Sequence, residues 1–441
     1  MAEAFLDAAQ RAGAAAADTI VIEGQSVSID TRAGALEQAE RSERTDLGLR
    51  VLFGGRQACV SVSDTAPGTL AEAAERAVAM AREAPEDPHA GLAAPDQLAT
   101  AWDVDALDLC DPAPAPSPAA LREAALAAEA AAAAVRGISK IEGTSATHGT
   151  NRIHLAATNG FSAGFARSSA SVSCVAITGE GTDMERDWYG DGRVYLSDLE
   201  SPEEIGRKAA ERTLQRAGAR KPPTGHFPVL YDERVSSGLI GHLLSAANGA
   251  SVARGGSWLL DRLGEQVLPA GLSLTEDPLR PRSGSSRPFD AEGLPVTARA
   301  IVSDGVLTGW TLDLATARKL GMESTGNASR SPSGPPAPGL SNIALTQGDA
   351  SRDDLIAAMG TGLLVTGLIG ATINPTTGDY SRGASGLWVE NGEIAYPVNE
   401  CTIAGNLHEM LRSITPANDA RPHLSRVVPS LLVEGLTIAG A

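Results

Sequence analysis

Helical spacing and strand-like alternation divide the N-terminal part of the chain into distinct elements. Residues 2–17 are Ala-rich, with apolar side chains at helical spacing, which predicts a first helix. Residues 20–62 alternate between apolar and polar positions around Gly54-Gly55, which predicts a strand meander with a turn there. Residues 70–82 place Ala, Val and Met on one face and predict a second helix. Together these elements make a small α+β unit.

A second unit with the same kinds of element follows a break in this pattern. Residues 84–118 are rich in Pro and Asp and predict a linker with short ordered pieces. The Ala-rich residues 118–135 predict a long helix that opens the second unit. We expect the rest of the unit to contain four short strands and a closing helix, at residues 138–142, 152–158, 162–166, 169–178 and 203–216.

The two units end in similar segments. Ser63-Asp64 precedes Pro67 and an Ala-containing helix, and Ser197-Asp198 precedes Pro202 and a helix with similar spacing. Each unit therefore has the order helix, strand meander, capped helix, and we interpret the pair as an internal duplication of one α+β unit. The simpler alternative is that Ser-Asp followed by Pro is a common way to start a helix.

The last part of the chain is rich in Gly and has the pattern of strands and turns. Pro222-Pro223 marks its start, because paired prolines stiffen a linker and forbid helix. Asn391-Gly392 predicts a β-hairpin, because type I′ turns require positive φ at both central positions. Helices are expected over residues 235–250 and 352–359, within an otherwise strand-rich domain.

These patterns predict an α+β fold in three parts. A chain of 441 residues exceeds what one hydrophobic core usually serves, so several domains are expected. The first two parts, residues 1–98 and 99–220, are the related α+β units. The third, residues 221–441, is a larger β-rich C-terminal domain.

The charge of the chain narrows the range of functions. It has 54 Asp and Glu against 36 Lys and Arg, a formal net charge of −18, whereas nucleic-acid binding needs a positive footprint. The most apolar stretch, residues 363–373, is about half as long as a membrane span. The N-terminus has no basic segment before an apolar run, and the four cysteines form no CxxC pair. We expect a cytoplasmic protein without a nucleic-acid or membrane partner.

Motifs for catalysis are weak when taken from the residues alone. The Gly-rich segments lack the Lys-Ser/Thr of a phosphate-binding loop, and no usable Gly-x-Ser-x-Gly is present, so nothing favours a Ser-His-Asp triad. The seven histidines contain no HExxH pair, the usual start of a hydrolytic zinc site. His242 lies in an apolar helix and is followed by two leucines. A lone histidine in such a helix is more often a packed, hydrogen-bonded residue than a metal ligand.

Several stretches, in collinear order over nearly the whole chain, resemble one known family. They are residues 48–51, 54–57, 77–88, 325–330, 339–342, 374–383 and 429–435. The sequence is similar to the TldD/PmbA family, a peptidase family of the U62 type whose members are also described as modulators of DNA gyrase. The resemblance implies two related α+β units and a larger β-rich C-terminal domain.

The family has two branches, and this chain resembles the PmbA (TldE) branch. TldD-like members carry an HExxxH zinc motif and a downstream Cys ligand, and PmbA-like members lack both and pair with TldD. Laid on this chain, the motif starts at His242, but Leu243 replaces the general-base Glu and Ala247 replaces the second His. Residues 426–428 offer no Cys. The resemblance therefore implies no catalytic residue, no cofactor and no metal here, with His242 a vestigial position.

The function implied by the resemblance is that of a non-catalytic subunit. It would act with a TldD-like zinc-bearing partner on extended or unfolded peptides; a homodimer without that partner is left open. Long polar segments that lack secondary-structure period supply the candidates for peptide contact, or else are ordered surface turns. The candidates are Asn327, Arg330, Asn374, Asp379 and Arg382. Two other functions stay open: a stand-alone peptidase with an unrecognised site, and a non-enzymatic protein-binding modulator of the DNA gyrase type.

Overall fold

The first unit contains the expected helix, meander and helix. In the computed structural model, which describes residues 1–440, its elements are α1 (Ala2–Arg11), β1 (Ala16–Arg32), β2 (Ala35–Phe53), β3 (Arg56–Val62) and α2 (Pro67–Glu83). The Gly54-Gly55 turn and the second helix are confirmed. The first helix ends earlier than expected, because Gly13 takes a φ of 93° and the residues from Ala16 on join the sheet.

The second unit corrects the expected strand pattern. Its elements are α4 (Pro118–Ala133), β4 (Ile138–Ala157), β5 (Ser162–Thr178), β6 (Glu185–Arg193) and α5 (Pro202–Leu214). The linker before it contains η1 (Pro95–Gln97) and α3 (Val104–Leu107). Two short 3₁₀ turns, η2 (Gly181–Asp183) and η3 (Leu196–Asp198), lie within the unit. The prediction of four short strands is wrong. The polar stretches continue as strand because neighbouring hydroxyls pair across the sheet, as in the 2.7 Å hydrogen bond between the Oγ atoms of Thr147 and Ser171.

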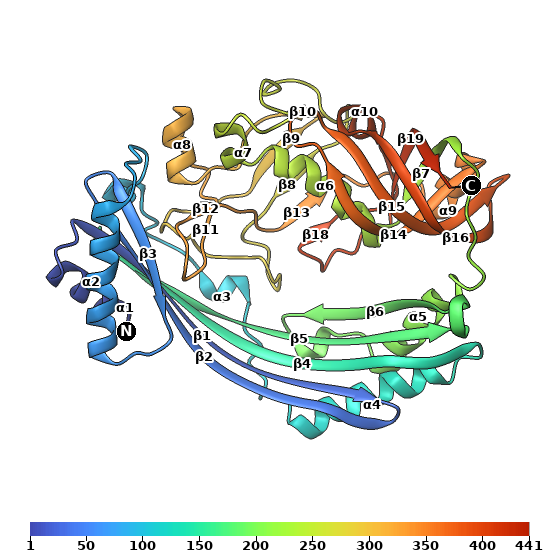
Figure 1. Cartoon of the computed structure of the whole chain (residues 1–441), viewed down its shortest axis with the longest axis horizontal. Helices are drawn as coiled ribbons and strands as arrows, with labels where there is room; N and C mark the ends of the chain where they lie inside the picture. Colours follow the sequence, from blue (N-terminus) through green and yellow to red (C-terminus); the bar gives the residue numbers. More distant parts are fainter. Residues whose placement is uncertain (441) are drawn as a thin grey trace.

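Both units contribute to one antiparallel sheet. Its strand order is β3-β2-β1-β4-β5-β6, with β1 and β4 paired at the centre from Asp18↔Ala157 to Thr31↔Thr144. Each unit thus supplies three strands in the order α-β-β-β-α, which is consistent with an internal duplication. The sheet is long and curved, with α1 and α2 at one end and α4 and α5 at the other (Figure 1).

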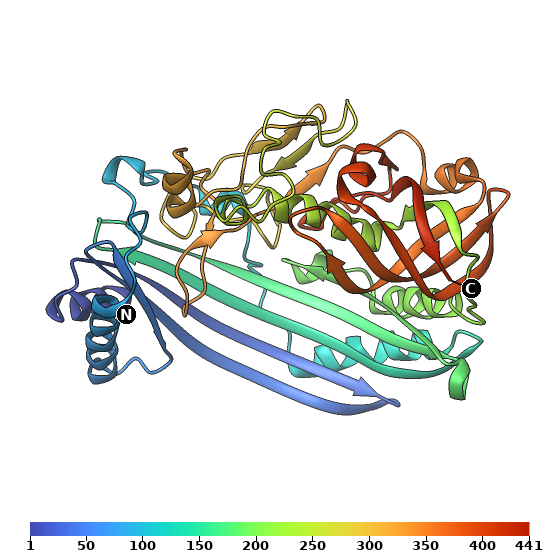
Figure 2. The same cartoon turned by 45° about the horizontal axis from the view of Figure 1, so that its top comes forward.

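The two faces of this sheet have different neighbours. On β1, Val21 packs with α1 and α2, and Ile29 packs with α4 and α5, so both helix pairs lie on the same face. Ile20 alternates to the opposite face and packs toward the C-terminal domain, where Phe161 and Phe289 stack edge to face with ring centroids 5.1 Å apart. The C-terminal domain therefore sits on the face of the sheet that carries no helices (Figure 2).

The C-terminal domain contains a closed β-sheet. Strands follow the order β16-β15-β14-β7-β19, and β16 also pairs with β19, which closes the ring into a barrel. The elements of this part are β7 (Gly225–Tyr231), α6 (Glu233–Ala246), α7 (Gly249–Ala253), α9 (Arg352–Met359), β14 (Gly362–Ile373), β15 (Asp379–Glu390), β16 (Glu393–Asn406), α10 (Leu407–Arg412), β17 (Thr415–Pro416) and β19 (Leu431–Ala439). The hairpin at Asn391-Gly392 is confirmed, with φ of 54° and 80°.

A second, smaller sheet completes the domain. It has the order β10-β9-β8-β13-β18. Its strands and their attachments are β8 (Leu274–Glu276), β9 (Arg299–Ser303), β10 (Val306–Leu307), α8 (Leu314–Leu320), the hairpin β11 (Ala328–Ser329) and β12 (Ala337–Pro338), β13 (Ile343–Leu345) and β18 (Arg426–Val427). The helix expected over 352–359 is confirmed as α9, and the one over 235–250 is split into α6 and α7. Within residues 1–440, no helix is both long and apolar enough to cross a membrane.

Candidate functional site around His242

Helix α6 positions the histidine that the sequence singled out. Asp232 caps the start of the helix, and its side chain accepts a hydrogen bond from the Arg234 backbone N–H. Leu239, Ile240 and Leu243 face the main core of the C-terminal domain and fix the rotation of the helix. His242 is left on the stripe of α6 that is only partly buried.

The residues present do not fit a hydrolytic zinc ion. Leu243 and Ala247, which stand where the motif has its glutamate and second histidine, are both 0 % exposed and point into the apolar core. A carboxylate or imidazole at either position would be buried there without a water-filled site. Within residues 1–440, no three His, Cys, Asp or Glu side chains are grouped so that they could hold a metal ion. His242 is therefore an isolated potential ligand.

One tyrosine packs against His242, and a second is hydrogen-bonded to the first. The ring of Tyr380, from β15, meets the imidazole edge to face, with centroids 5.7 Å apart. The Tyr231 hydroxyl, from β7, donates to the Tyr380 hydroxyl over 3.4 Å. Both tyrosines are buried, and burial raises the pKa of each above its ordinary value. Both side chains are therefore neutral phenols that can form hydrogen bonds, and neither is an anion.

Arg382 supplies positive charge next to the imidazole. Burial lowers the pKa of His242, and the charge of Arg382 on β15 lowers it further. The same guanidinium acts on Tyr231 and Tyr380. The Nε2 atom of His242 and the Nε atom of Arg382 are both buried and have no hydrogen-bond partner. A cation in this position opposes a metal ion, because like charges repel in a partly buried site.

The C-terminal segment also reaches α6. Arg426, on β18, places its Nη1 atom 3.3 Å from where a Cβ on Gly241 would lie. The missing side chain of Gly241 thus makes room for a second guanidinium beside the residue that precedes His242. The segment that would carry a cysteine ligand in the TldD branch therefore does lie beside α6, but it brings a guanidinium.

Two of the expected peptide-contact residues are buried beside the hairpin β11–β12, Asn327 within the C-terminal domain and Arg330 against the N-terminal sheet. Asn327 is 2 % exposed, and its amide nitrogen donates to both carboxylate oxygens of Glu276, at 2.8 and 3.0 Å. The Arg330 side chain is 0 % exposed and forms an ion pair with Asp18 of β1, which also pairs with Arg50 of β2. The hairpin β11–β12 that carries both residues extends onto the N-terminal sheet (Figure 2). Through Arg330, this polar segment forms a buried contact between the C-terminal domain and the N-terminal sheet.

The other two candidates outside the His242 region form an exposed turn. Asn374 accepts hydrogen bonds through its side chain from the backbone N–H groups of Thr376 and Thr377. Asp379 accepts from the Thr377 hydroxyl and from the Asn406 amide. These bonds satisfy the turn internally and agree with an ordered surface turn. The five candidates therefore lie in three separate places, and only Arg382 lies beside His242.

Sequence reasoning missed several residues of these sites. Tyr231 gave no signal, and Tyr380 and Arg426 lay in segments compared with the family but were not singled out, because nothing in one strand shows which helix it will face. Arg50 lies within the predicted meander, but Asp18 precedes it, and only the β1–β2 register places the two residues opposite each other. A pair of charges at matching strand positions is the one signal that could have indicated the buried ion pair.

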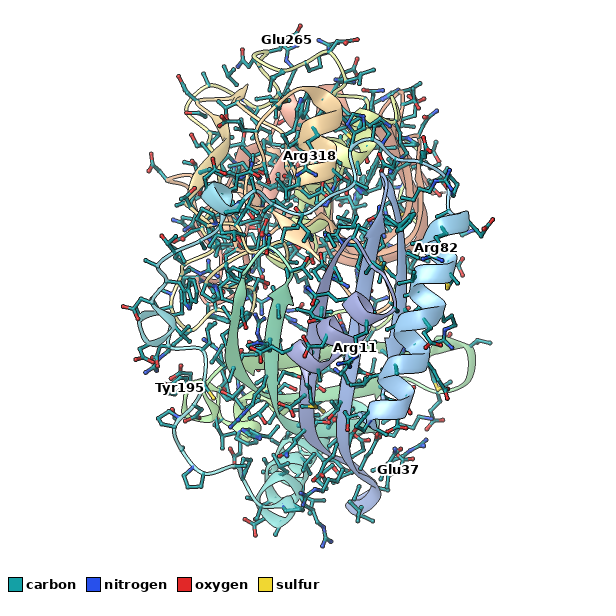
Figure 3. All side chains as sticks on the ribbon, turned by 90° about the vertical axis from the view of Figure 1, so that its left-hand side faces the viewer. Arg11, Glu37, Arg82, Tyr195, Glu265 and Arg318 are labelled. Atoms are coloured by element: carbon teal, nitrogen blue, oxygen red, sulfur yellow. The ribbon has the colours of Figure 1, made fainter. Side chains whose placement is uncertain are left out.

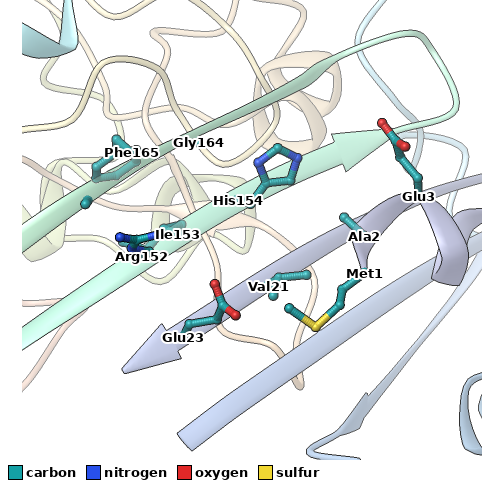
Figure 4. Close-up of a pocket in the computed structure, with 11 residues that line it drawn as sticks. Met1, Ala2, Glu3, Val21, Glu23, Arg152, Ile153, His154, Gly164 and Phe165 are labelled. Carbon is teal, nitrogen blue, oxygen red and sulfur yellow. The ribbon is translucent and has the colours of Figure 1, made fainter. Parts of the chain in front are cut away.

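Three hollows lie elsewhere, on the helix-bearing face of the N-terminal sheet. One cavity of about 540 Å³ is lined by Val21, Glu23, Arg152 and His154 beside the start of α1 (Figure 4). Two more, of about 570 and 310 Å³, continue along the same face and share Thr150. They occupy the part of the sheet between the two helix pairs. None of these three cavities includes His242.

Arg318 joins the C-terminal domain to the linker. Arg318 on α8 donates to the backbone carbonyls of His89 and Leu92, over 3.0 and 2.8 Å. Viewed from the α2 side, Arg318 lies on its helix above Arg82 and Arg11 (Figure 3). The linker is thereby held against α8.

Comparison with known proteins gives consistent matches over the whole chain. Family models for the PmbA/TldA metallopeptidase match in three parts, domain 1 at residues 17–81, the central domain at 111–217 and the C-terminal domain at 224–440. The chain is 39 % identical to the metalloprotease PmbA of Escherichia coli O157:H7, over 96 % of this chain and 92 % of that protein. It is 35 % identical to the metalloprotease PmbA homolog of Haemophilus influenzae, over 99 % and 94 %.

Solved structures match over the full length. A protein described as a putative modulator of DNA gyrase from Bacteroides thetaiotaomicron has a TM-score of 0.92 at 28 % identity, covering 100 % of this chain and 98 % of that one. TldE from Thermococcus kodakarensis has a TM-score of 0.86 at 21 % identity, covering 99 % of each chain, and this shows a shared fold. With these matches, the chain belongs to the PmbA/TldD metallopeptidase family.

Proposed function

We propose that this chain is the non-catalytic, metal-free subunit of a two-protein metalloprotease of the PmbA/TldD type. Its partner is a TldD-like subunit that carries the zinc, and the complex acts on small, extended or unfolded peptides in the cytoplasm. The supporting observation is the surroundings of His242. Leu243 and Ala247 are buried in the core, and the charged group beside the imidazole is the guanidinium of Arg382.

Metal-dependent hydrolysis needs a zinc-bound water and a base that takes its proton. Neither can be assembled from the residues around His242, because the tyrosines beside it are kept neutral and Arg382 is a cation. What such a subunit contributes is shape and contact surface. It can enclose the partner's site and restrict entry to chains that are not folded.

The N-terminal sheet offers a strand edge suited to extended chains. β3 pairs with β2 only from Leu47 to Phe53, so residues 35–46 of β2 have β1 on one side and no described strand on the other. Most of these residues are exposed. An extended peptide, or a strand of the partner, can add to such an edge through main-chain hydrogen bonds. The length of this edge favours peptide handling over a purely structural role.

Reconstitution tests the proposal. The chain and the TldD-like protein of the same organism are purified separately and mixed, and hydrolysis of an unfolded protein and of a fluorogenic peptide is measured. We expect the chain alone to be inactive and the mixture to exceed the partner alone. The matched control is a partner whose motif glutamate is replaced by glutamine, and a mixture made with it should hydrolyse no peptide. Hydrolysis by the chain alone would refute the proposal, as would a mixture no more active than the partner.

A pull-down distinguishes the proposed peptidase subunit from the alternative, a non-enzymatic protein-binding modulator. A non-enzymatic modulator would capture a protein such as DNA gyrase in the absence of any TldD-like subunit, and the captured complex would hydrolyse no peptide. Under the proposed function, the TldD-like subunit is the protein retained and hydrolysis accompanies it.

A further inference from the structure

Two guanidinium groups lie beside consecutive residues of α6 without an acidic partner. On β15, Arg382 is two residues from Tyr380, whose ring contacts His242, so the two side chains project from the same face of the strand. Arg426 places its Nη1 atom 3.3 Å from where a Cβ on Gly241 would lie. Salt bridges elsewhere in the C-terminal domain engage Arg234, Arg299, Arg352 and Arg421. Among the described residues, none engages Arg382 or Arg426. The pair is therefore a concentration of positive charge that the fold itself leaves unneutralised.

Hydrogen-bonding capacity is also left unused at this place. The Nε–H of Arg382 and the Nε2 atom of His242 are buried and have no partner within residues 1–440. A buried polar group without a partner is unfavourable, and more so when it is charged. Most buried polar groups in proteins are satisfied, so an unsatisfied cluster suggests a missing ligand. The cluster is reachable from solvent, because Arg426 is exposed and His242 is only partly buried.

We propose that Arg382, Arg426 and His242 form a binding site for the free C-terminal carboxylate of a peptide. This inference rests on the proposed function, in which the complex handles peptides. Guanidinium groups suit a carboxylate because their N–H donors match its two oxygens in a planar fork. The ring of Tyr380, which meets the His242 imidazole edge to face, gives one side of this site an apolar surface. The polar carboxylate of the peptide would therefore lie toward the guanidinium groups. The place where the TldD branch has a cation would here hold an anion.

Binding of matched peptides tests the site directly. The probes are dansyl-Ala-Ala-Ala with a free carboxylate, the same peptide as its C-terminal amide, and dansyl-Ala-Glu-Ala as its amide, which carries only a side-chain carboxylate. Fluorescence anisotropy with the full-length chain gives each dissociation constant. We expect the free acid to bind at least about tenfold more tightly than either amide, because only it presents a terminal carboxylate to both guanidiniums. Equal binding of the acid and its plain amide would overturn the proposal, and so would equal binding of the acid and the Glu-containing amide.

Variants locate the binding on the chain. Arg382→Gln and Arg426→Gln should each weaken the free acid about tenfold or more while leaving the amides unchanged. The matched control is Arg254→Gln, an exposed arginine of the same domain with the same change in net charge. Thermal unfolding of each variant establishes that the fold is retained. A loss of affinity in Arg254→Gln equal to that in the other two would overturn the site and indicate attraction by net charge alone.

NMR of the imidazole gives an independent readout. An anion bound beside His242 favours its protonated form, so saturation with the free-acid peptide should raise its pKa. The resonance is assigned with His242→Ala, and His408, which lies beside Trp258, serves as the internal reference. An unchanged His242 pKa at saturation would place the peptide elsewhere and overturn the proposal. Peptide hydrolysis by the chain alone would refute the proposed function, whereas a lack of carboxylate preference refutes only this site.

Discussion

Asp18 is held between two arginines that come from different domains. Burial would raise the pKa of its carboxyl, but the charges of Arg330 and Arg50 outweigh burial and hold that pKa below its ordinary value. Arg50 donates through Nε to Asp18 over 2.9 Å from the neighbouring strand, whereas Arg330 comes from the C-terminal domain. The buried Asp18 carboxylate is not stabilised by water, so it depends on its two arginine partners to remain charged.

Replacing Arg330 with methionine should therefore destabilise the protein strongly. Arg330→Met keeps much of the side-chain volume but leaves Asp18 with one partner, and breaking a buried pair costs about 3–5 kcal/mol. Urea unfolding at neutral pH measures the change. Arg262→Met is the control, because Arg262 pairs with Glu265 at the surface, where such a pair contributes about 0–1 kcal/mol. Similar losses in the two variants would contradict the role given to Arg330.

Removing Arg382 should shift the titration of His242 upward. Burial and the Arg382 charge both lower the pKa of the imidazole, so Arg382→Gln leaves burial and removes the repulsion. The His242 pKa should rise toward, but not reach, its ordinary value of about 6.5. NMR titration measures it, and His408 should stay unchanged because its pKa is lowered by burial and by Arg262 and Arg412. A His242 pKa unaffected by Arg382→Gln would mean that the guanidinium lies too far away.

At the scale of elements, local signals predicted helices better than strands. Helix α4 was found from its Ala-rich spacing and α9 from residues 352–359, because their periodicity is contained in the segment itself. β4 and β5 were broken into pieces, since their polar stretches are stabilised by neighbours that the sequence does not reveal. The short helices α8 and α10 gave too few turns for any period to show.

Contact between hairpin β11–β12 and strand β2 depends on the lack of a side chain at Gly48. A Cβ there would lie 2.2 Å from the backbone oxygen of Pro332, closer than atoms can approach. Gly48→Ala should lower the free energy of unfolding by about 1–3 kcal/mol, the usual cost of overpacking. Gly68→Ala is the matched control, because nothing lies within 4 Å of a Cβ at that position in α2 and alanine suits a helix. Equal stability of Gly48→Ala and the unsubstituted protein would show that the hairpin can move away freely.

At the scale of the molecule, the sequence predicted the α+β class and a β-rich C-terminal domain, and both are observed. It did not predict that the two N-terminal units share a sheet, nor that β16 pairs with β19 to close the barrel. Both depend on pairing between distant segments, for which one sequence carries no local signal. Likewise, the lone histidine was predicted from the sequence, but the two guanidiniums beside α6 were not, because they come from β15 and β18.

Buried carboxyls at the domain contact should make stability depend on pH. Burial, with the nearby charge of Asp290, raises the pKa of Glu292 from 4.5 to about 8. A carboxyl with a raised folded pKa binds more protons in the folded state. Its contribution to stability is therefore complete below pH 4.5 and is lost as the pH rises through about 8. The expected loss is on the order of 3–5 kcal/mol across that window.

Urea unfolding between pH 5 and 9 measures this dependence, with Glu292→Gln as the comparison. The glutamine keeps an acceptor for the Leu314 backbone N–H, which the Glu292 carboxylate accepts over 2.9 Å, but it cannot ionise. The variant should therefore lose less stability than the unsubstituted protein as the pH rises. Parallel curves for the two proteins would show that Glu292 titrates outside this range.

Zinc content and hydrolysis measured together on the isolated chain test the central claim most directly. The chain is purified without chelator, equilibrated with excess zinc and dialysed; bound metal is then determined by mass spectrometry, and peptide cleavage is assayed on the same sample. With Leu243 and Ala247 in the core and Arg382 beside His242, we predict that zinc stays far below stoichiometric and that no peptide is cleaved. Stoichiometric zinc that survives dialysis, is lost in His242→Ala and accompanies peptide cleavage would contradict the account.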